Sequence, residues 1–337
     1  AVRDSLREMM PEDQLWPPLE SEAWSFHSVT QGAKYFGEIK RAMERGYGAP
    51  KDIDDFCNKA YAMNYNSARG MYEAYGRNKY SATGITTWKY DAAWPAATTW
   101  HYIDWYLRPT GAYFGAKKAC EPLHIQYAYD DNGVYVINSL YEPFTGLKAS
   151  ATVYDFDLSS KLTKSANVNV DPDGKALAFK LEWPKEISKT FFLKLELHDS
   201  NGTLQSRNFY WLSTTPDIPG PSPDGWGAFV AKPESVADFT LLNSLPPVTL
   251  ETTLTHQTRG DEVQAEITVK NPAANLAFLI QLALTKGPEG RELGPTYWED
   301  NYFSLLPGET RTLKATVPKS ELGNATPALR ITGWNVQ

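Results

Sequence analysis

The stretch from Trp88 to Pro95 is the densest group of aromatic and polar residues in the chain. The rings of Trp88 and Trp94 can cover the flat C–H faces of a sugar, while the carboxylate of Asp91 can bind its hydroxyl or amino groups. Aromatic residues also close the hydrophobic core of many barrels, so the composition leaves a binding role and a packing role open. We take Trp88, Lys89, Asp91 and Trp94 as candidate substrate-binding residues.

A second aromatic group runs from Trp24 to His27. An imidazole between aromatic rings most often satisfies a local hydrogen bond and has no further role. Trp24 and His27 become candidate substrate-binding residues only through the family resemblance described below.

Hydrolysis of a glycosidic bond with retention requires two carboxyl groups about 5–5.5 Å apart. Asp91 and Asp104 are the acids near the first aromatic stretch, and Asp104 falls in a predicted helix, where a solvated or helix-pairing position is expected. No convincing carboxylate pair is present, nor is a nucleophile elbow, a phosphate-binding loop or a dinucleotide fingerprint. We therefore expect no catalytic residue in this chain.

Composition excludes several other classes of function. The formal net charge of −7 disfavours nucleic acid as a partner, and no apolar stretch approaches 18 residues, which disfavours a membrane span. Two cysteines and five histidines show no metal-ligand spacing, so we expect neither a metal nor another cofactor.

Residues 1–121 are rich in predicted helices. Apolar spacing predicts an amphipathic helix over 2–10, a helix over 30–45 that Thr30 caps, and a third from about 53 to 75. The stripe of the third helix consists of Ile53, Phe56, Cys57, Ala60, Met63, Ser67, Met71 and Tyr75. A buried strand at 84–88 and a helix at 99–107 are expected to follow. Since a (β/α)8 TIM barrel needs about 250 residues, this block fits only its last one or two units.

From residue 122 the apolar period changes to two. Leu147, Ala149, Ala151 and Val153 alternate with polar residues, and tight-turn signals separate the predicted strands. This pattern predicts a β-sandwich over 122–215 and a second one over 226–337, with the Pro- and Gly-rich segment 216–225 as the linker. The expected fold class is therefore multidomain, α/β plus all-β: the C-terminal part of a TIM barrel followed by two immunoglobulin-like β-sandwiches.

Several of these segments resemble one family. Tyr113–Tyr127 resembles the barrel-to-sandwich junction of glycoside hydrolase family 2 in its exo-β-D-glucosaminidase branch, and so does the stretch from Thr83 to Pro95. Trp298–Phe303 and Gly333–Val336 resemble the terminal immunoglobulin-like domain of that branch. The resemblance covers essentially the whole chain.

The resemblance implies the C-terminal chain of a retaining exo-β-glycosidase that hydrolyses β-D-glucosaminides from the non-reducing end of chitosan-type oligosaccharides. The acid/base and nucleophile glutamates would lie upstream of Ala1, on an N-terminal partner chain that carries the rest of the barrel. This chain alone is then expected to be inactive. The family is usually secreted, periplasmic or vacuolar, so we expect an extracytoplasmic location.

Residue by residue, Trp88 matches the tryptophan that lines the sugar subsite of the family, and Trp94 matches a second one. Asp91 stands where the branch often has Asn, which leaves the exact substrate open. Lys89 and the Trp24–His27 group are similar to the plant-type endo-β-mannosidases, so a β-mannosidase or endo-β-mannosidase is the nearest alternative. A non-catalytic sugar-binding β-sandwich protein is the alternative from another class.

Overall fold

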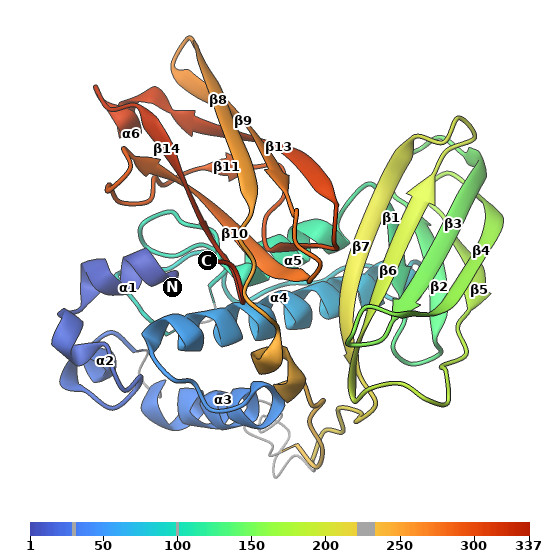
Figure 1. The fold of residues 1–337 in the computed structure, drawn as a ribbon, viewed down its shortest axis with the longest axis horizontal. Helices are drawn as coiled ribbons and strands as arrows, with labels where there is room; N and C mark the ends of the chain where they lie inside the picture. The colour runs from blue at the N-terminus through green and yellow to red at the C-terminus, as the bar shows by residue number, and fades with distance from the viewer. Residues whose placement is uncertain (29–31, 99–100, 221–232) are drawn as a thin grey trace.

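A computed structural model describes residues 1–28, 32–98, 101–220 and 233–337, with the side chains of residues 32–35 left out. The described chain comprises a helical region (residues 1–121) and two β-sandwiches, and helix α4 runs beneath both sandwiches (Figure 1). None of the helices in the described ranges is both long enough and apolar enough to cross a membrane.

The helical region is built around the 25-residue helix α4. Its N-terminus is capped by Asp52, whose carboxylate accepts a hydrogen bond from the Asp55 backbone N–H at 2.8 Å. The helices of this region are α1 (Arg3–Met9), α2 (Glu22–Phe26), α3 (Gly32–Tyr47), α4 (Ile53–Arg77) and α5 (Gly111–Ala119), with a 3₁₀ turn at Glu12–Gln14. The expected helices over 2–10, 30–45 and 53–75 are therefore confirmed, although Thr30, the expected cap, lies outside the described residues.

The expected strand at 84–88 is wrong. Residues 83–87 have no regular secondary structure and belong to no sheet, and their side chains are exposed or half-buried. Gly84 to Trp88 have the β-forming composition of a strand, but a strand also needs neighbours that accept its backbone hydrogen bonds, and the described chain places none there.

The expected helix at 99–107 is also wrong for its described part, because residues 101–107 form bends and turns. The expected solvated position of Asp104 is wrong as well, since its buried carboxylate accepts backbone hydrogen bonds from Val2, Tyr106 and Arg108. These bonds organise a turn in which Leu107 has a positive φ of 61°. The helix that follows the loop is α5, which begins at Gly111.

The first sandwich has a four-stranded sheet in the order β4-β3-β6-β7 and a three-stranded sheet in the order β1-β2-β5. The predicted inward faces are correct: Phe191, Leu193, Leu195 and Leu197 are all buried. The strands are β1 (Leu123–Tyr127), β2 (Gly133–Asn138), β3 (Phe144–Tyr154), β4 (Ser160–Val170), β5 (Lys175–Lys180), β6 (Thr190–His198) and β7 (Leu204–Ser213).

The second sandwich pairs a four-stranded sheet, β11-β13-β9-β8, with a three-stranded sheet, β12-β10-β14. A 3₁₀ turn at Thr240–Ser244 leads into it, and the short helix α6 (Lys319–Leu322) joins its last two strands. The strands are β8 (Glu251–Arg259), β9 (Glu262–Lys270), β10 (Ala277–Lys286), β11 (Tyr297–Trp298), β12 (Phe303–Leu305), β13 (Thr310–Pro318) and β14 (Pro327–Thr332).

The hydrophobic residues form two clusters that do not coincide with the three regions. One cluster fills the interior of the first sandwich. The other is continuous through the helical region and the second sandwich, and it also includes Phe192 and Trp211 from the outer face of the first sandwich. The helical region is therefore packed against both sandwiches.

Candidate functional site

The structure brings His27 and Trp94 together at the C-terminal end of α2. Their rings are stacked with centroids 5.8 Å apart, and Phe26 contacts both rings edge-on. The His27 Nδ1 lies 2.6 Å from the carbonyl oxygen of Pro95, while the His27 carbonyl accepts a hydrogen bond from Ala97. These contacts fix the end of α2 to the loop that carries Trp94.

Trp88 lies on the same loop and is 79% exposed. The peptide bond between Trp88 and Lys89 is cis. Trp88 lines a cavity of about 680 Å³ together with Thr86, Thr87 and His101. A large exposed ring at the mouth of a cavity is suited to stacking on a sugar.

Asp91 and Lys89 take different positions on this loop. Asp91 is exposed, and its backbone forms an isolated bridge with Ile103. Lys89 is half-buried close to His101. The pKa of His101 is well below its usual range because burial disfavours the charged ring, with the positive charges of the Ala1 amine and Lys89 adding to that effect.

Trp24 lies apart from this group, in the core of the helical region. It is 1% exposed, its Nε1 donates a hydrogen bond to the Leu15 carbonyl at 3.0 Å, and its ring packs edge-on against Phe56. The ring forms part of the inner wall of the cavity. The structure thus gives Trp24 a packing role, and a contact with sugar stays a prediction.

The cavity is lined mainly by apolar side chains of α3 and α4. The predicted apolar stripe of α4 faces it, through Phe56, Ala60, Met63, Ser67 and Met71. Met71 is half-exposed at this wall. The side of α4 that packs on the sandwiches is instead more polar, with Lys59, Arg69 and Glu73 buried.

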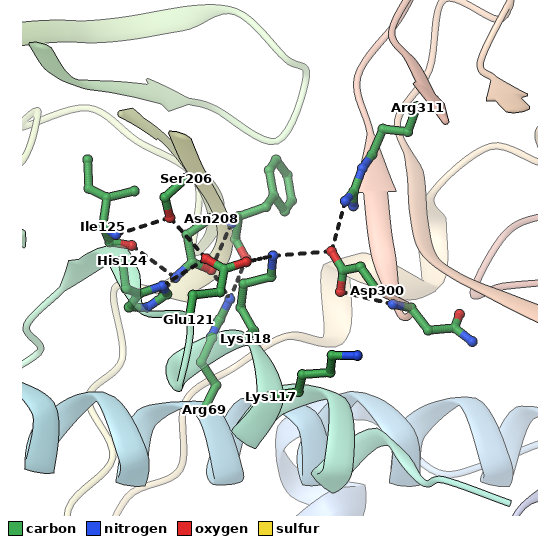
Figure 2. A network of polar contacts seen from close by, with 12 residues as sticks. Arg69, Lys117, Lys118, Glu121, His124, Ile125, Ser206, Asn208, Asp300 and Arg311 are labelled. Atoms are coloured by element: carbon green, nitrogen blue, oxygen red, sulfur yellow. Dashed lines mark hydrogen bonds and ion pairs between the residues drawn. The ribbon is translucent and has the colours of Figure 1, made fainter. Parts of the chain in front are cut away.

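A buried polar network joins this polar side of α4 to both sandwiches (Figure 2). Glu73 Oε1 accepts hydrogen bonds from His124 Nε2 at 3.0 Å, Asn208 Nδ2 at 2.7 Å and Tyr210 OH at 2.7 Å. The other ring nitrogen of His124 lies 3.1 Å from Glu121 Oε2. Burial opposes protonation of His124, but these two carboxylates outweigh it and raise its pKa.

The network continues from Glu121 into the second sandwich. Lys118 Nζ lies 2.7 Å from Glu121 and 3.2 Å from Asp300, and Arg311 lies 2.9 Å from the same Asp300 oxygen. Burial of Asp300 is outweighed by these two cations, which lower its pKa to about 2. The resemblance predicted a junction at residues 113–127, but nothing in the sequence indicated that Glu73 and Asp300 would belong to one network there.

Across the described ranges, no three His, Cys, Asp or Glu side chains gather in a way that could hold a metal ion. Most groups of the junction network have protein partners, although Glu73 Oε2 and Arg69 Nε have none among the described residues. The loop around Trp88 instead presents exposed groups to a cavity. The loop is therefore the candidate binding site, and the junction has a structural role.

Comparison with known proteins defines the class first. Residues 132–215 match the family described as "Mannosidase Ig/CBM-like domain", and residues 228–336 match "Exo-beta-D-glucosaminidase Ig-fold domain". Both sandwiches are thus immunoglobulin-like domains of the kind found in glycosidases.

Similarity to individual proteins extends over nearly the whole chain. The chain is 36% identical to an exo-β-D-glucosaminidase of Streptomyces avermitilis over 98% of its own length and 38% of that protein. The exo-chitosanase CsxA of Amycolatopsis orientalis superimposes with a TM-score of 0.89 at 32% identity, over 99% of this chain and 40% of that one. A mannosylglycoprotein endo-β-mannosidase of Lilium longiflorum is 25% identical over 93% of this chain and 37% of that protein. The predicted resemblance to exo-β-D-glucosaminidases is confirmed, and the chain spans less than half of each of these relatives.

Proposed function

We propose that this chain is the C-terminal portion of a retaining exo-β-D-glucosaminidase that acts on chitosan-type oligosaccharides. In this proposal residues 1–121 form the end of a (β/α)8 barrel, and the catalytic glutamates lie in the portion of the enzyme that precedes Ala1. A polymeric substrate of this kind further supports an extracytoplasmic location.

The orientation of α4 is the observation that best supports this proposal. Its apolar stripe lines a cavity of about 680 Å³ that also contains Thr86, Thr87 and Trp88. In a (β/α)8 barrel the apolar side of each helix covers the strands, and the residues at the carboxyl ends of the strands face the substrate. The cavity wall is therefore suited to contact the remaining strands of the barrel, with Trp88 at the substrate-binding end.

Asp91 supports a glucosaminide as the substrate. Its exposed carboxylate lies three residues from Trp88 and is suited to a charge-assisted hydrogen bond with the ammonium group of glucosamine. The similarity to the Lilium enzyme keeps a β-mannoside as the second candidate. A mannoside carries no ammonium group, so the charge of Asp91 separates the two.

The test uses the complete enzyme, with Asp91→Asn and with Asp261→Asn as the matched exposed control. Hydrolysis of an aryl β-D-glucosaminide and an aryl β-D-mannoside is measured for each. We expect Asp91→Asn to lower kcat/KM for the glucosaminide by roughly 10- to 100-fold, the range for losing a charged hydrogen bond, and to leave the mannoside rate unchanged. Equal relative rates in the wild type and Asp91→Asn would remove Asp91 from substrate selection.

A further inference from the structure

Backbone and side-chain contacts bring three tyrosines from separate parts of the chain toward the region of the Trp88 loop. Tyr90 follows Trp88 by two residues, so their Cα atoms are at most about 7 Å apart. Tyr90 and Tyr297 are 61% and 62% exposed, and Tyr113 is half-buried. They come from the loop, from α5 and from β11 of the second sandwich.

Backbone hydrogen bonds place Tyr90 at the N-terminal end of α5. The Tyr90 carbonyl accepts a hydrogen bond from Tyr102, and the Tyr102 carbonyl accepts one from Thr110. Thr110 is the residue that precedes α5, and Tyr113 lies in the first turn of that helix. The Tyr90 segment is thus tied, through Tyr102, to the start of the helix that carries Tyr113.

A second set of contacts places Tyr297 beside the same turn. Lys117 lies four residues after Tyr113, on the same face of α5, and its ammonium donates a hydrogen bond to the Trp298 carbonyl. The pKa of Tyr113 is raised by burial and, to a smaller extent, by the neighbouring Tyr90 and Tyr297. Both observations put Tyr297 within reach of Tyr113.

Carboxylates flank the row of tyrosines. Asp91 adjoins Tyr90, and Glu299 shares the outward face of its strand segment with Tyr297 because side chains alternate along a strand. Both acids are exposed, and Glu299 accepts a hydrogen bond from the Lys314 backbone at 3.2 Å. Among the cations nearby, Lys117 is bound to the Trp298 carbonyl, and Lys89, which precedes Tyr90, is half-buried. Aromatic faces with flanking carboxylates match a chain of amino sugars, whose rings stack and whose ammonium groups are positive.

We propose that Tyr90, Tyr113 and Tyr297 form an aromatic strip that binds the second and third sugar residues of a β-linked glucosamine chain, after the residue held at Trp88. The strip rests on the proposed function and extends it, because it assigns the second sandwich a direct part in recognising substrate length. Tyr297 is its outermost member and the one that the second sandwich supplies.

The test uses the complete enzyme and compares two substrates, an aryl β-D-glucosaminide and chitosan oligomers of two to six residues. The wild type is expected to show a higher kcat/KM as the oligomer lengthens. Tyr297→Ala is expected to reduce the ratio of oligomer to aryl-glucosaminide kcat/KM by about 5- to 10-fold, the range of one aromatic contact. Tyr297→Phe keeps the ring and should retain the ratio, and Tyr141→Ala, which removes a 90% exposed tyrosine from the first sandwich, should not change it.

The outcomes separate the strip from the proposed function. If the wild type hydrolyses neither substrate, the proposed function fails. If it hydrolyses both and Tyr297→Ala leaves the ratio unchanged, the strip is overturned and the function stands. If Tyr297→Ala lowers both rates equally or lowers the melting temperature, the tyrosine packs against the upstream part of the protein, which also overturns the strip.

Discussion

The two faces of helix α4 differ in a way that composition does not suggest. The face that looks like a core stripe in the sequence, with Met63 and Met71, lines a cavity. The face that carries Arg69 and Glu73 is buried, these two side chains are at most 1% exposed, and both contact the first sandwich. Burial of charged groups is tolerated there because each has several hydrogen-bond or cation–π partners. Apolar character therefore identifies a surface that needs a partner, but the partner can lie outside the described chain.

Loss of the Glu73 carboxylate should have the largest effect on stability. Glu73→Ala leaves the buried His124, Asn208 and Tyr210 without their shared acceptor, and we expect a loss of about 3–5 kcal/mol in the free energy of unfolding, as for other broken buried charge pairs. Urea denaturation of the complete enzyme measures it. Glu251→Ala, which removes one partner of an exposed pair with Lys270, is the control and should cost less than about 1 kcal/mol. A Glu73 variant as stable as this control would show that the network adds nothing.

The next effect is a pH dependence from Glu292, at the contact between α1 and the second sandwich. Burial raises its pKa from 4.5 to about 7, although Arg108 and Arg330 oppose the rise; the carboxylates of Asp4 and Asp104 add to it. The folded state therefore binds this proton more tightly than the unfolded state does. The resulting stability is fully present below about pH 4.5 and is lost as the pH rises through about 7, by about 3 kcal/mol in total.

Glu292→Gln isolates this contribution because glutamine does not titrate. We expect the variant to lack the decline that Glu292 causes between about pH 4.5 and 7, while the raised pKa of His124, whose stabilising charge is also lost at higher pH, stays in both proteins. The difference in unfolding free energy between wild type and variant is measured across this range. A difference that does not vary with pH would contradict the raised pKa.

The smallest effect tests the other face of α4. Met71 is 41% exposed in the described chain, and a substitution at such a position usually changes stability by less than about 0.5 kcal/mol. If the upstream part of the enzyme covers this face, Met71→Ala should instead cost about 2 kcal/mol in the complete enzyme, the lower end for a buried methionine. Thermal or urea unfolding distinguishes the two, with Tyr141→Ala as the exposed control. A cost no larger than that of the control would leave the apolar face uncovered.

The sequence predicted the sandwiches well because their pattern reflects local geometry. Alternation at Leu193, Leu195 and Leu197 requires only that one side of a strand is buried, and the fold satisfies it. The prediction of a strand at 84–88 was wrong because a strand needs neighbouring strands, and the local sequence does not specify them. The prediction of a helix at 99–107 was wrong for its described part. The Asp104 carboxylate accepts hydrogen bonds from the backbone N–H groups of Tyr106 and Arg108, and these bonds stabilise a turn there instead of a helix.

The candidate site was predictable in part. Trp88 and Trp94 were selected from residue type and position, and His27 from a resemblance; the structure stacks His27 on Trp94, and contact of these residues with a sugar stays a prediction. The burial of Trp24 could not be deduced, because its ring packs against Phe56 from another helix. The junction network was equally hidden, since Glu73 and His124 are 51 residues apart and meet only in the folded chain.

The hydrophobic cluster shared by the helical region and the second sandwich has a consequence for modularity. Secondary structure divides the described chain into the helical region and two sandwiches. One hydrophobic cluster is continuous through the helical region and the second sandwich, whereas the interior of the first sandwich forms a separate cluster. The first sandwich meets the helical region through an outer surface that includes Trp211 and through groups that bind Arg69 and Glu73, so its exchange would leave those buried charges without partners. Removal of the second sandwich would expose the interior of the helical region to water. In this chain the second sandwich is integral to the core of the helical region, although it is the part most distant from it in sequence.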